Sequence, residues 1–318
     1  MQTGPTLTVR AARTEDAPQI CELLNTIDTI EIGAPETDLH TVEADLTHPE
    51  VDLAHDSWLA LDDAGRLLAY ALTWDDSGGE RIDMDHYVLP DQQAAGETLL
   101  AAAEERARAK ARANGAARAV VHLHLNQRPT TDTGILTRRG WHTVRRYQVM
   151  VRDLTPHQDP LPEPPAGVTL RPCTDEADRR RAHALVEETF AEHFDHQPRP
   201  YERWLDDIDA EHLDWSLVWI AAVEGLGDAA VLLSRNDRAG MGWVRNLGVR
   251  EAARGRGLGG HLLRHAFGVY AALGRDTLGL GVDTLNKSGA LRLYEAHGMR
   301  LHYAVDTWEV TLPVAGDR

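Results

Sequence analysis

The sequence predicts two mixed α/β domains of one type, joined by a proline-rich linker. At 318 residues the chain exceeds the roughly 100 to 200 residues usual for one domain. Residues 155–167 hold five of its 15 prolines and show no apolar periodicity, which is typical of a semi-rigid linker. Residues 7–24 and 168–186 share the order strand, arginine, polar turn and acid-capped helix, which indicates an internal repeat. We therefore expect domains at 1–154 and 168–318.

Hydrophobic periodicity predicts the elements of the second half in order. A strand and a helix come first, then a helix that starts at a proline, three strands, and an amphipathic helix that opens at Gly257. A strand, a helix ended by Gly298 and a final pair of strands complete this half. The expected residues are, in that order, 167–172, 175–194, 200–213, 216–224, 229–236, 242–249, 257–274, 277–283, 287–298 and 299–312.

The first half repeats the same order of elements. Apolar alternation predicts three strands, then a long helix, a strand and the final strands. The expected residues are 57–63, 67–74, 82–89, 95–115, 119–125 and 142–154. Strands and helices that alternate in this way predict a mixed sheet in each half.

Composition limits the partners that the protein can have. Lys and Arg number 33 against 50 Asp and Glu, so the formal net charge is -17. Nucleic acid and anionic membranes are therefore poor partners, and a cationic small molecule such as an amine would suit this charge, although acidity more often serves solubility alone. Cys21 and Cys173 cannot build a disulfide framework. No apolar run approaches the roughly twenty residues of a membrane helix, so we expect a soluble cytoplasmic protein, monomeric or homodimeric.

Gly255, Gly257 and Gly260 have the G-x-G-x-x-G spacing of dinucleotide-binding loops. Such a loop follows an apolar strand directly, but here the polar residues 250–254 intervene. Too little chain remains after the loop to complete a doubly wound sheet, although Asp283 stands where such folds carry an acid. A phosphate loop of the Lys-Ser/Thr type is excluded because that pair does not follow the glycines.

A second spacing, Arg254-x-x-Gly257-x-Gly259, fits a different phosphate ligand better. Glycines let the backbone turn tightly and expose its N–H groups, and the helix that starts there adds its positive end. Arg254 and Arg256 add charge. Charge-assisted hydrogen bonds of roughly 1.5 to 3 kcal/mol each are enough to anchor a diphosphate. A plain glycine-rich turn with solvated arginines is the alternative at this point.

Residues 242–267 and 278–300, in this order and at this separation, resemble the coenzyme A-binding core of the GNAT acetyltransferase superfamily. Strong similarity covers roughly residues 243–300, and the rest of the chain agrees in element order alone. The two-half arrangement resembles tandem members of the superfamily. The resemblance implies two tandem GNAT (acyl-CoA N-acyltransferase) domains, with acetyl-CoA as the cosubstrate.

The resemblance also implies roles for particular residues. The pantetheine arm is expected between two parted strands, with the diphosphate at the glycine-rich loop and Asn286 near the pantetheine or acetyl end. Tyr294 stands where relatives donate a proton to the departing sulfur, and the Val249 N–H is placed to hold the oxyanion. The expected cofactor-binding residues are Leu247, Gly248, Val249, Arg254, Gly255, Arg256, Gly257, Leu258, Gly259, Gly260 and Asn286.

The general base is left open by the sequence. Trp243 stands where some relatives carry a glutamate, and an indole cannot accept a proton. Candidates lie in the segment that matches the acceptor-side helices, although each is also explained as a solvated helix residue: Glu187, Glu192, His193, His196 and Glu202. Arg245 is expected on the same side, either binding an acceptor carboxylate or pairing with an acid.

The first half lacks the loop chemistry. Its counterpart of the loop is shorter by two residues and has lost both arginines and most glycines, and Leu136 stands in place of Tyr294. We expect this half to serve as a scaffold or as a wall of the acceptor site. His122 and His124 alternate along a strand, but no third ligand lies near them in sequence, so no metal is expected.

These observations predict an N-acetyltransferase whose second domain moves an acetyl group from acetyl-CoA to a primary amine of a small molecule. Direct transfer is expected because the matched motifs contain no cysteine to carry an acetyl group. A non-catalytic acyl-CoA-binding sensor is the alternative.

Overall fold

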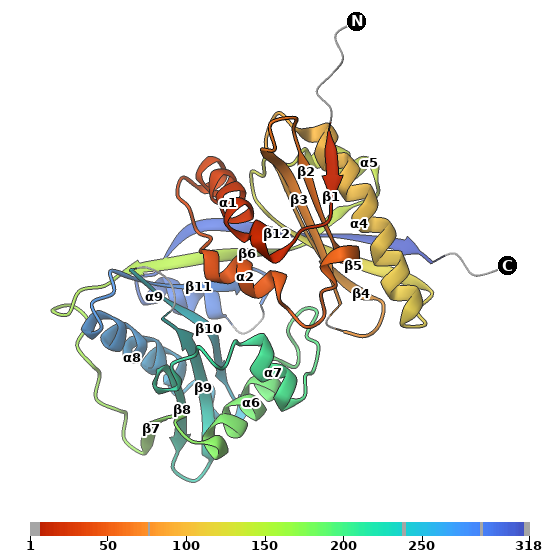
Figure 1. Cartoon of the computed structure of the whole chain (residues 1–318). Helices are drawn as coiled ribbons and strands as arrows, with labels where there is room; N and C mark the ends of the chain where they lie inside the picture. The colour runs from red at the N-terminus through yellow and green to blue at the C-terminus, as the bar shows by residue number, and fades with distance from the viewer. Residues whose placement is uncertain (1–6, 76, 237–239, 287–288, 315–318) are drawn as a thin grey trace, which may run out of the picture. The chain divides into compact units, whose positions relative to one another are not determined.

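The structure is a computed structural model that describes residues 7–75, 77–236, 240–286 and 289–314 (Figure 1). Contacts within the chain divide it into two compact units. Residues 1–146 and 303–318 form the first unit, and residues 147–302 form the second unit. Each unit is a mixed sheet covered by helices on both faces, as the sequence predicts.

The first unit has one parallel strand pair, β4 with β5, among antiparallel neighbours. Its strands lie in the order β1 (Thr8–Arg10), β2 (Ser57–Leu61), β3 (Leu67–Trp74), β4 (Arg81–Val88), β5 (Arg118–Asn126) and β12 (Arg300–Pro313). Its helices are α1 (Ala17–Ile32), α2 (Leu39–Leu46), α3 (Leu53–Asp56), α4 (Gln93–Ala113) and α5 (Thr133–Arg138).

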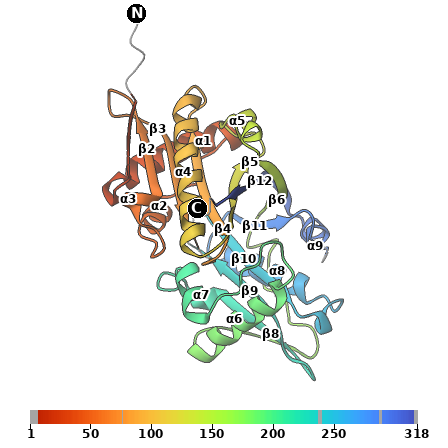
Figure 2. The same cartoon turned by 90° about the vertical axis from the view of Figure 1, so that its right-hand side faces the viewer.

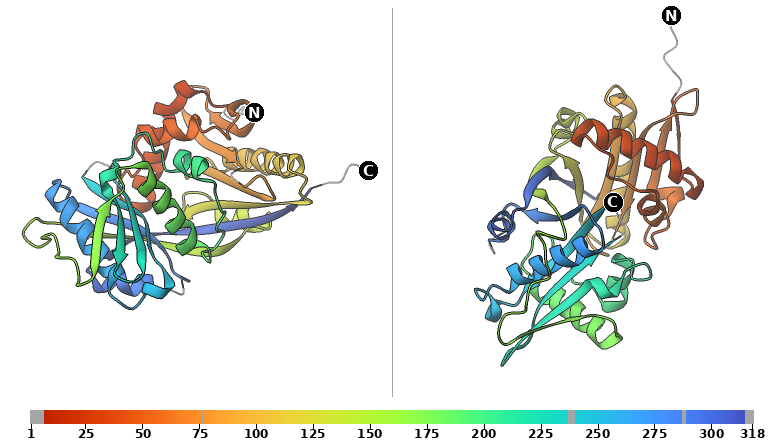
Figure 3. Two further views of the ribbon diagram at one scale, coloured as in Figure 1. Left: turned by 90° about the horizontal axis from the view of Figure 1, so that it is seen from below. Right: turned by 90° about the vertical axis from the view of Figure 1, so that its left-hand side faces the viewer.

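Two hydrophobic clusters hold the first unit together. On one face of the sheet α4 buries Leu99 and Leu100 against strand residues such as Met84. On the other face α1 and α2 bury Ile20 and Val42 (Figures 2 and 3). Residues of β2 and β3 alternate between the two clusters, so these two strands contribute to both cores.

The second unit repeats this plan with one parallel pair, β10 with β11. Its strands lie in the order β6 (His142–Asp153), β11 (Thr277–Asp283), β10 (Met241–Val249), β9 (Gly227–Arg235), β8 (Val218–Val223) and β7 (Val168–Pro172). Its helices are α6 (Glu176–Phe190), α7 (Tyr201–Asp207), α8 (Leu258–Ala272) and α9 (Ala290–Ala296). Helix α8 covers one face of β8–β10, and α6 and α7 cover the other (Figure 1).

The last strand of each half pairs inside the other unit. Strand β6 pairs with β11 through residues 147–153, and β12 pairs with β5 through residues 305–313. The domain boundaries expected at 154 and 168 therefore do not coincide with the two units. The pair of strands predicted for 299–312 is wrong, because this segment is one continuous strand that uses the whole edge of β5.

The proline-rich segment 155–167 has no helix or strand, as expected, but it is fixed to the second unit. Asp159 is buried, accepts the Thr155 N–H at 3.0 Å and pairs with Arg152 at 2.6 Å. The Arg152 guanidinium lies 4.2 Å from the ring centre of Phe267 on α8. The segment is thus a packed strap on α8 and not a free spacer.

In each unit the two parallel strands part before they end. The β10–β11 pairs stop at Val244 and Leu280, although β10 continues to Val249. The β4–β5 pairs stop at Met84 and Leu123, although β4 continues to Val88. Parted parallel strands leave backbone groups unpaired at the gap, where a ligand can bind them.

Candidate functional site

The gap between β10 and β11 opens into a cavity of about 550 Å³ in the second unit. Helices α6, α8 and α9 and the glycine-rich loop complete its walls. The lining residues are Tyr147, Thr189, Phe190, His193, Val244, Arg245, Leu247, Gly248, Val249, Ala253, Arg254, Gly255, Gly257, Leu258, Gly259, Gly260, Leu280, Gly281, Val282, Asp283, Asn286, Gly289, Ala290, Leu293 and Tyr294. Every predicted cofactor-binding residue except Arg256 lines it.

The glycine-rich loop directs backbone N–H groups at the cavity. Gly255 and Gly257 have φ values of 75° and 76°, in the left-handed region that favours glycine. Gly257 is the N-cap residue of α8, and its carbonyl accepts the His261 N–H at 2.9 Å. The N–H groups of the first turn have no partners inside the helix, and they carry its positive end. The mouth of α8 is therefore suited to an anion.

The end of β10 turns alternate backbone groups toward the gap. The Arg250 N–H donates to Ala229 on β9 at 2.9 Å. Because polar groups alternate along a strand, the N–H and C=O groups of Leu247 and Val249 point away from β9. That direction is toward the parted strand β11, as a pantetheine chain bound like an added strand would require.

Gly248 lets α6 approach the strand closely. A side-chain Cβ at this position would lie 2.1 Å from Thr189 Oγ1 and 2.8 Å from Thr189 Cβ. Both distances are far below van der Waals contact. Glycine is thus needed here because of the packing of α6 and not because of backbone twist.

The two loop arginines differ in position. Arg254 lines the cavity, and its Nε donates to the Val249 carbonyl at 3.2 Å. Arg256 is exposed and does not line the cavity. The role of Arg256 in binding the diphosphate therefore stays a prediction, and its side chain would have to extend further than that of Arg254 to reach the ligand.

Tyr294 lies in the wall, on α9, with only 7% of its surface exposed. Burial raises the pKa of its phenol to about 12. The phenol is therefore protonated at neutral pH and is available as a proton donor.

Asn286 lines the cavity just after β11, in a turn where its N–H donates to the Asp283 carbonyl at 3.1 Å. The Asp283 carboxylate also accepts the Leu285 N–H at 2.8 Å, which fixes the turn. The predicted helix at 287–298 is observed from Ala290, and residues 287–288 lie outside the described residues.

Among the five candidate bases, only His193 lines the cavity. It follows the end of α6, where its N–H donates to the Phe190 carbonyl at 2.8 Å and the two rings lie 4.3 Å apart. Burial lowers the pKa of His193, while the Asp283 carboxylate opposes that shift. The imidazole is therefore neutral at pH 7 and can accept a proton.

The other four candidates lie elsewhere in the second unit. His196 Nε2 lies 3.2 Å from the Glu187 carboxylate, within hydrogen-bonding distance, so these two candidates pair with each other. Glu202 lies 3.6 Å from Arg180, and Glu192 is exposed. The helices predicted at 175–194 and 200–213 end early, at Phe190 and Asp207, so Glu192, His193 and His196 lie beyond the end of α6.

Trp243 and Arg245 lie at the β-bulge of β10. Arg245 lines the cavity and is exposed, which suits the predicted contact with an acceptor. The Trp243 ring lies over Gly279 of β11, where a Cβ would come within 2.9 Å of it. The indole closes the sheet beside the gap and offers no group that can accept a proton.

Sequence reasoning missed several lining residues. Tyr147 comes from β6, opposite Asp283 in the antiparallel pair, and nothing near it in sequence indicates that neighbour. Thr189 and Phe190 lie at the end of α6, and they line the site because Gly248 admits the helix. Only the pairing of distant segments could have identified them.

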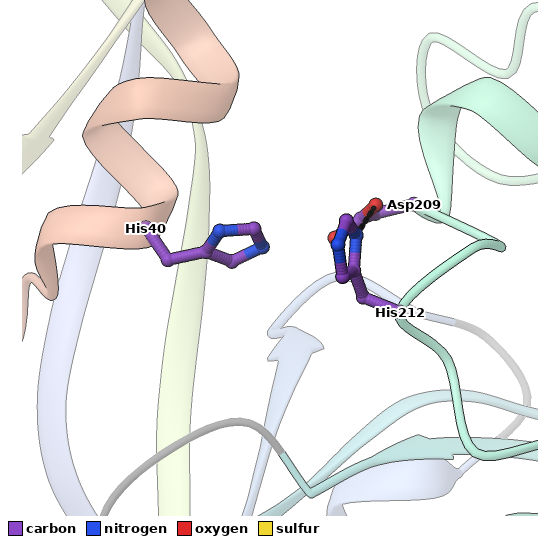
Figure 4. A group of neighbouring side chains, drawn as sticks. All are labelled: His40, Asp209 and His212. Carbon is purple, nitrogen blue, oxygen red and sulfur yellow. Dashed lines mark hydrogen bonds and ion pairs between the residues drawn. The ribbon is translucent and has the colours of Figure 1, made fainter.

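Three histidines outside the cavity of the second unit have acid or hydroxyl neighbours. His122 Nε2 lies 2.9 Å from Glu309, and His124 Nδ1 lies 3.1 Å from the Thr307 hydroxyl, both across the β5–β12 pair. After α7, His212 Nδ1 lies 2.8 Å from Asp209 (Figure 4). The hydrogen bond to Asp209 raises the pKa of His212. The contacts of these three histidines are therefore accounted for by neighbouring side chains.

Known proteins resemble both the second unit and the whole chain. Residues 214–299 match the family model described as an acetyltransferase (GNAT) domain. A mycothiol acetyltransferase from Stackebrandtia nassauensis is 28% identical over 306 residues, which cover 89% of this chain and 92% of that protein.

Two solved structures give the same picture. A GCN5-related N-acetyltransferase from Sphaerobacter thermophilus has a TM-score of 0.82 at 27% identity, and the match covers 98% of each chain. A tandem GNAT protein from the clavulanic acid biosynthesis pathway has a TM-score of 0.71 at 16% identity, covering 98% of this chain and 100% of that one. The predicted tandem fold is confirmed. Within the described residues, no helix combines the length and the apolar character needed to cross a membrane.

Proposed function

We propose that this chain is a GNAT acetyltransferase whose second unit transfers the acetyl group of acetyl-CoA directly to a primary amine of a small molecule. One observation carries the proposal. The cavity of about 550 Å³ has the helix start at Gly257 on one wall and the phenol of Tyr294 on another. An anion-binding end and a proton donor in one cavity are what transfer from a coenzyme thioester requires.

The diphosphate is assigned to the mouth of α8. The first-turn N–H groups after Gly257 and the guanidinium of Arg254 supply donors and positive charge on a wall of the cavity. Arg254 already donates to the Val249 carbonyl, so its side chain lies along the route between the loop and the strand gap.

The pantetheine arm is assigned to the gap between β10 and β11. Leu247 and Val249 direct backbone groups there, and Asn286 and Gly281 line the opposite side. An extended chain of amides bound in this way satisfies strand groups that would otherwise be unpaired in the gap.

Tyr294 is assigned as the general acid. The amine nitrogen bonds to the acetyl carbon, the carbon–sulfur bond breaks, and the phenol proton goes to the sulfur. The Val249 N–H stabilises the oxyanion that forms between these two events. A pKa raised to about 12 keeps Tyr294 protonated at neutral pH, so that its proton is present when the sulfur departs.

His193 is assigned as the group that removes the amine proton. It lines the cavity on the α6 side, and its lowered pKa keeps it neutral near pH 7. The general base that the sequence left open thus becomes a single testable residue. Whether the proton passes directly or through water does not change that test.

The acceptor substrate is assigned to the class of small amines. The net charge of -17 favours a cation over an anionic or nucleic acid partner. The relative from Stackebrandtia nassauensis is named for a small-molecule acetylation, which favours a metabolite over a protein acceptor.

A thiol-release assay tests the proposal. The full chain is mixed with acetyl-CoA and a panel of small amines, and products are identified by mass spectrometry. We expect thiol release that depends on the amine and equals the amount of N-acetyl product. Tight coenzyme binding with no acceptor that raises thiol release above background would contradict the proposal and favour a sensor.

A further inference from the structure

The first unit has its own cavity, of about 190 Å³, at the parted strands β4 and β5. Helix α1, the loop before α5 and β12 complete its wall. The lining residues are Ile27, Asp28, Glu31, Ile32, His86, Tyr87, His124, Leu125, Asn126, Thr130, Thr131, Tyr303 and Val305. Two are carboxylates, and none is a lysine or an arginine.

This cavity is unsuited to a coenzyme diphosphate. Tyr87 precedes the strand end at Val88, where Gly248 precedes Val249 in the second unit, so a ring stands where the second unit has a glycine packed against α6. Helix α4 begins after Gln92, and its loop has neither arginine nor left-handed glycine. Asp28 and Glu31 would repel an anion.

Glu31 fixes the wall of the cavity. One of its carboxylate oxygens accepts the N–H and the hydroxyl of Thr130 at 2.5 and 2.9 Å, and the other accepts Asn126 Nδ2 at 2.7 Å. These three bonds tie α1 to the end of β5 and to the following loop. Glu31 therefore shapes the cavity, and Asp28 is the carboxylate that has capacity for a ligand.

Asp28 is only partly satisfied. Its Oδ2 accepts the Thr37 hydroxyl at 3.1 Å and the Glu36 N–H at 3.3 Å. Its Oδ1 accepts no hydrogen bond from the residues that the structure describes. Burial raises the pKa of Asp28, and Glu31 and Glu36 add to that shift, so a cation beside it would be favourable.

His86 supplies a second, independent acceptor. The residue is 3% exposed and lines the cavity, and its Nε2 lies 2.8 Å from the Gly96 carbonyl. A carbonyl only accepts, so Nε2 carries the proton, and burial lowers the pKa of the ring and keeps it neutral. Nδ1 is then a buried lone pair with no hydrogen-bond partner among the described residues. Such an atom requires a donor.

We propose that the cavity between β4 and β5 binds a small organic cation through a primary ammonium group, which donates to Asp28 and to His86 Nδ1. An ammonium group has three donors and no acceptor, which complements a set of acceptors without a basic residue. The site is distinct from the coenzyme cavity of the second unit and does not depend on the proposed function.

Calorimetry on the full chain tests this site with 1,4-diaminobutane as the probe, at about 0.15 M salt to screen unspecific attraction. The neutral 1,4-butanediol, of the same length, is the control. We expect the diamine to bind with one site per chain and the diol not to bind. Asp28→Asn should weaken diamine binding at least tenfold. Glu22→Gln, an equal charge change at an exposed position of the same helix, should leave binding within twofold.

A second variant protects the test against a misfolded Asp28→Asn. Ile32→Phe reduces the cavity without changing its charge, and it should also weaken diamine binding. Absence of binding to the folded wild type would overturn the proposal, as would equal losses in Asp28→Asn and Glu22→Gln. Acetyl-CoA binding measured in parallel should not change in Asp28→Asn, so failure of this site and failure of the coenzyme site can be told apart.

Discussion

In both units two parallel strands part before they end, but the cavities at the two gaps differ in size and in the charge of their lining. In the second unit the gap is lined by glycines and Arg254 and measures about 550 Å³. In the first unit it is lined by Asp28, Glu31 and aromatic rings and measures about 190 Å³. The fold therefore supplies an opening between two parallel strands, and a few side chains decide which ligand can enter it.

Three exchanges account for most of the difference. Where the second unit has a loop of left-handed glycines, the first unit has residues 89–92. Tyr87 stands at the position of Gly248. Leu136, which is fully buried in the core of the first unit, stands at the position of Tyr294. The first removes anion donors, the second places a ring where the second unit has a glycine packed against α6, and the third removes a phenol. Variants of the second unit test the assigned roles, from the largest expected effect to the smallest.

Tyr294→Phe should cause the largest loss. Removal of a general acid typically lowers the rate about 10² to 10⁴-fold, and we expect kcat to fall within that range. Acetyl-CoA affinity should be unchanged, because the ring stays in place. Steady-state thiol release and calorimetry measure the two quantities. Tyr70→Phe, a buried phenol of the first unit, is the control, and equal losses in both variants would rule out the assigned role.

Arg254→Ala should weaken acetyl-CoA binding by about 10 to 100-fold, which corresponds to the loss of one charge-assisted hydrogen bond of roughly 1.5 to 3 kcal/mol. Arg256→Ala makes the same charge change on an exposed residue outside the cavity wall, and its effect should be smaller. Equilibrium titration at two salt concentrations gives both values. A larger effect of Arg256→Ala would reverse the assignment of the diphosphate contact.

The pH dependence of kcat/KM sharpens the role of His193. Only the neutral imidazole accepts a proton, and burial lowers its pKa from the ordinary 6.5. Activity should thus be retained down to about pH 6.5 and should then fall up to about tenfold per pH unit as the ring becomes protonated. His193→Gln should be slow throughout and should lack this acid limb. An unchanged limb in the variant would exclude His193 as the base.

Gly257→Ala should give the smallest effect, and the first unit offers a matched control. Gly257 and Gly115 both have φ of 76°, and an added Cβ at either one has open space around it. Left-handed backbone at alanine costs about 1 to 2 kcal/mol, so both variants should lose similar stability in thermal or denaturant unfolding. Only Gly257→Ala should also weaken acetyl-CoA binding. If Gly115→Ala weakens it equally, the loop has no special role.

The sequence predicted the loop because its chemistry is local. Positive φ at Gly255 and Gly257, and a helix that starts directly after them, follow from residue type and spacing within one short segment. Most strands of both sheets were predicted for the same reason, since apolar alternation is also local, whereas residues 299–312 form one strand and not the predicted pair.

The pairing of the last strand of each half inside the other unit could not be predicted from local patterns. The same holds for the cavity residues that are distant in sequence from the glycine-rich loop. Tyr147 reaches the cavity because β6 pairs with β11, and no local pattern encodes which edge a final strand joins. Of five candidate bases in one segment, His193 alone lines the cavity because α6 ends at Phe190, and helix ends depend on tertiary packing. Sequence reasoning thus identified the segment but not the residue.

Hydrogen exchange with and without acetyl-CoA tests the central claim most directly, because it locates the bound coenzyme along the backbone. We predict slower exchange of the amides in residues 247–260, where β10 ends and α8 begins, and no change in residues 86–96 at the matching place in the first unit. Protection confined to residues 86–96, or saturating coenzyme without protection at 247–260, would contradict the account.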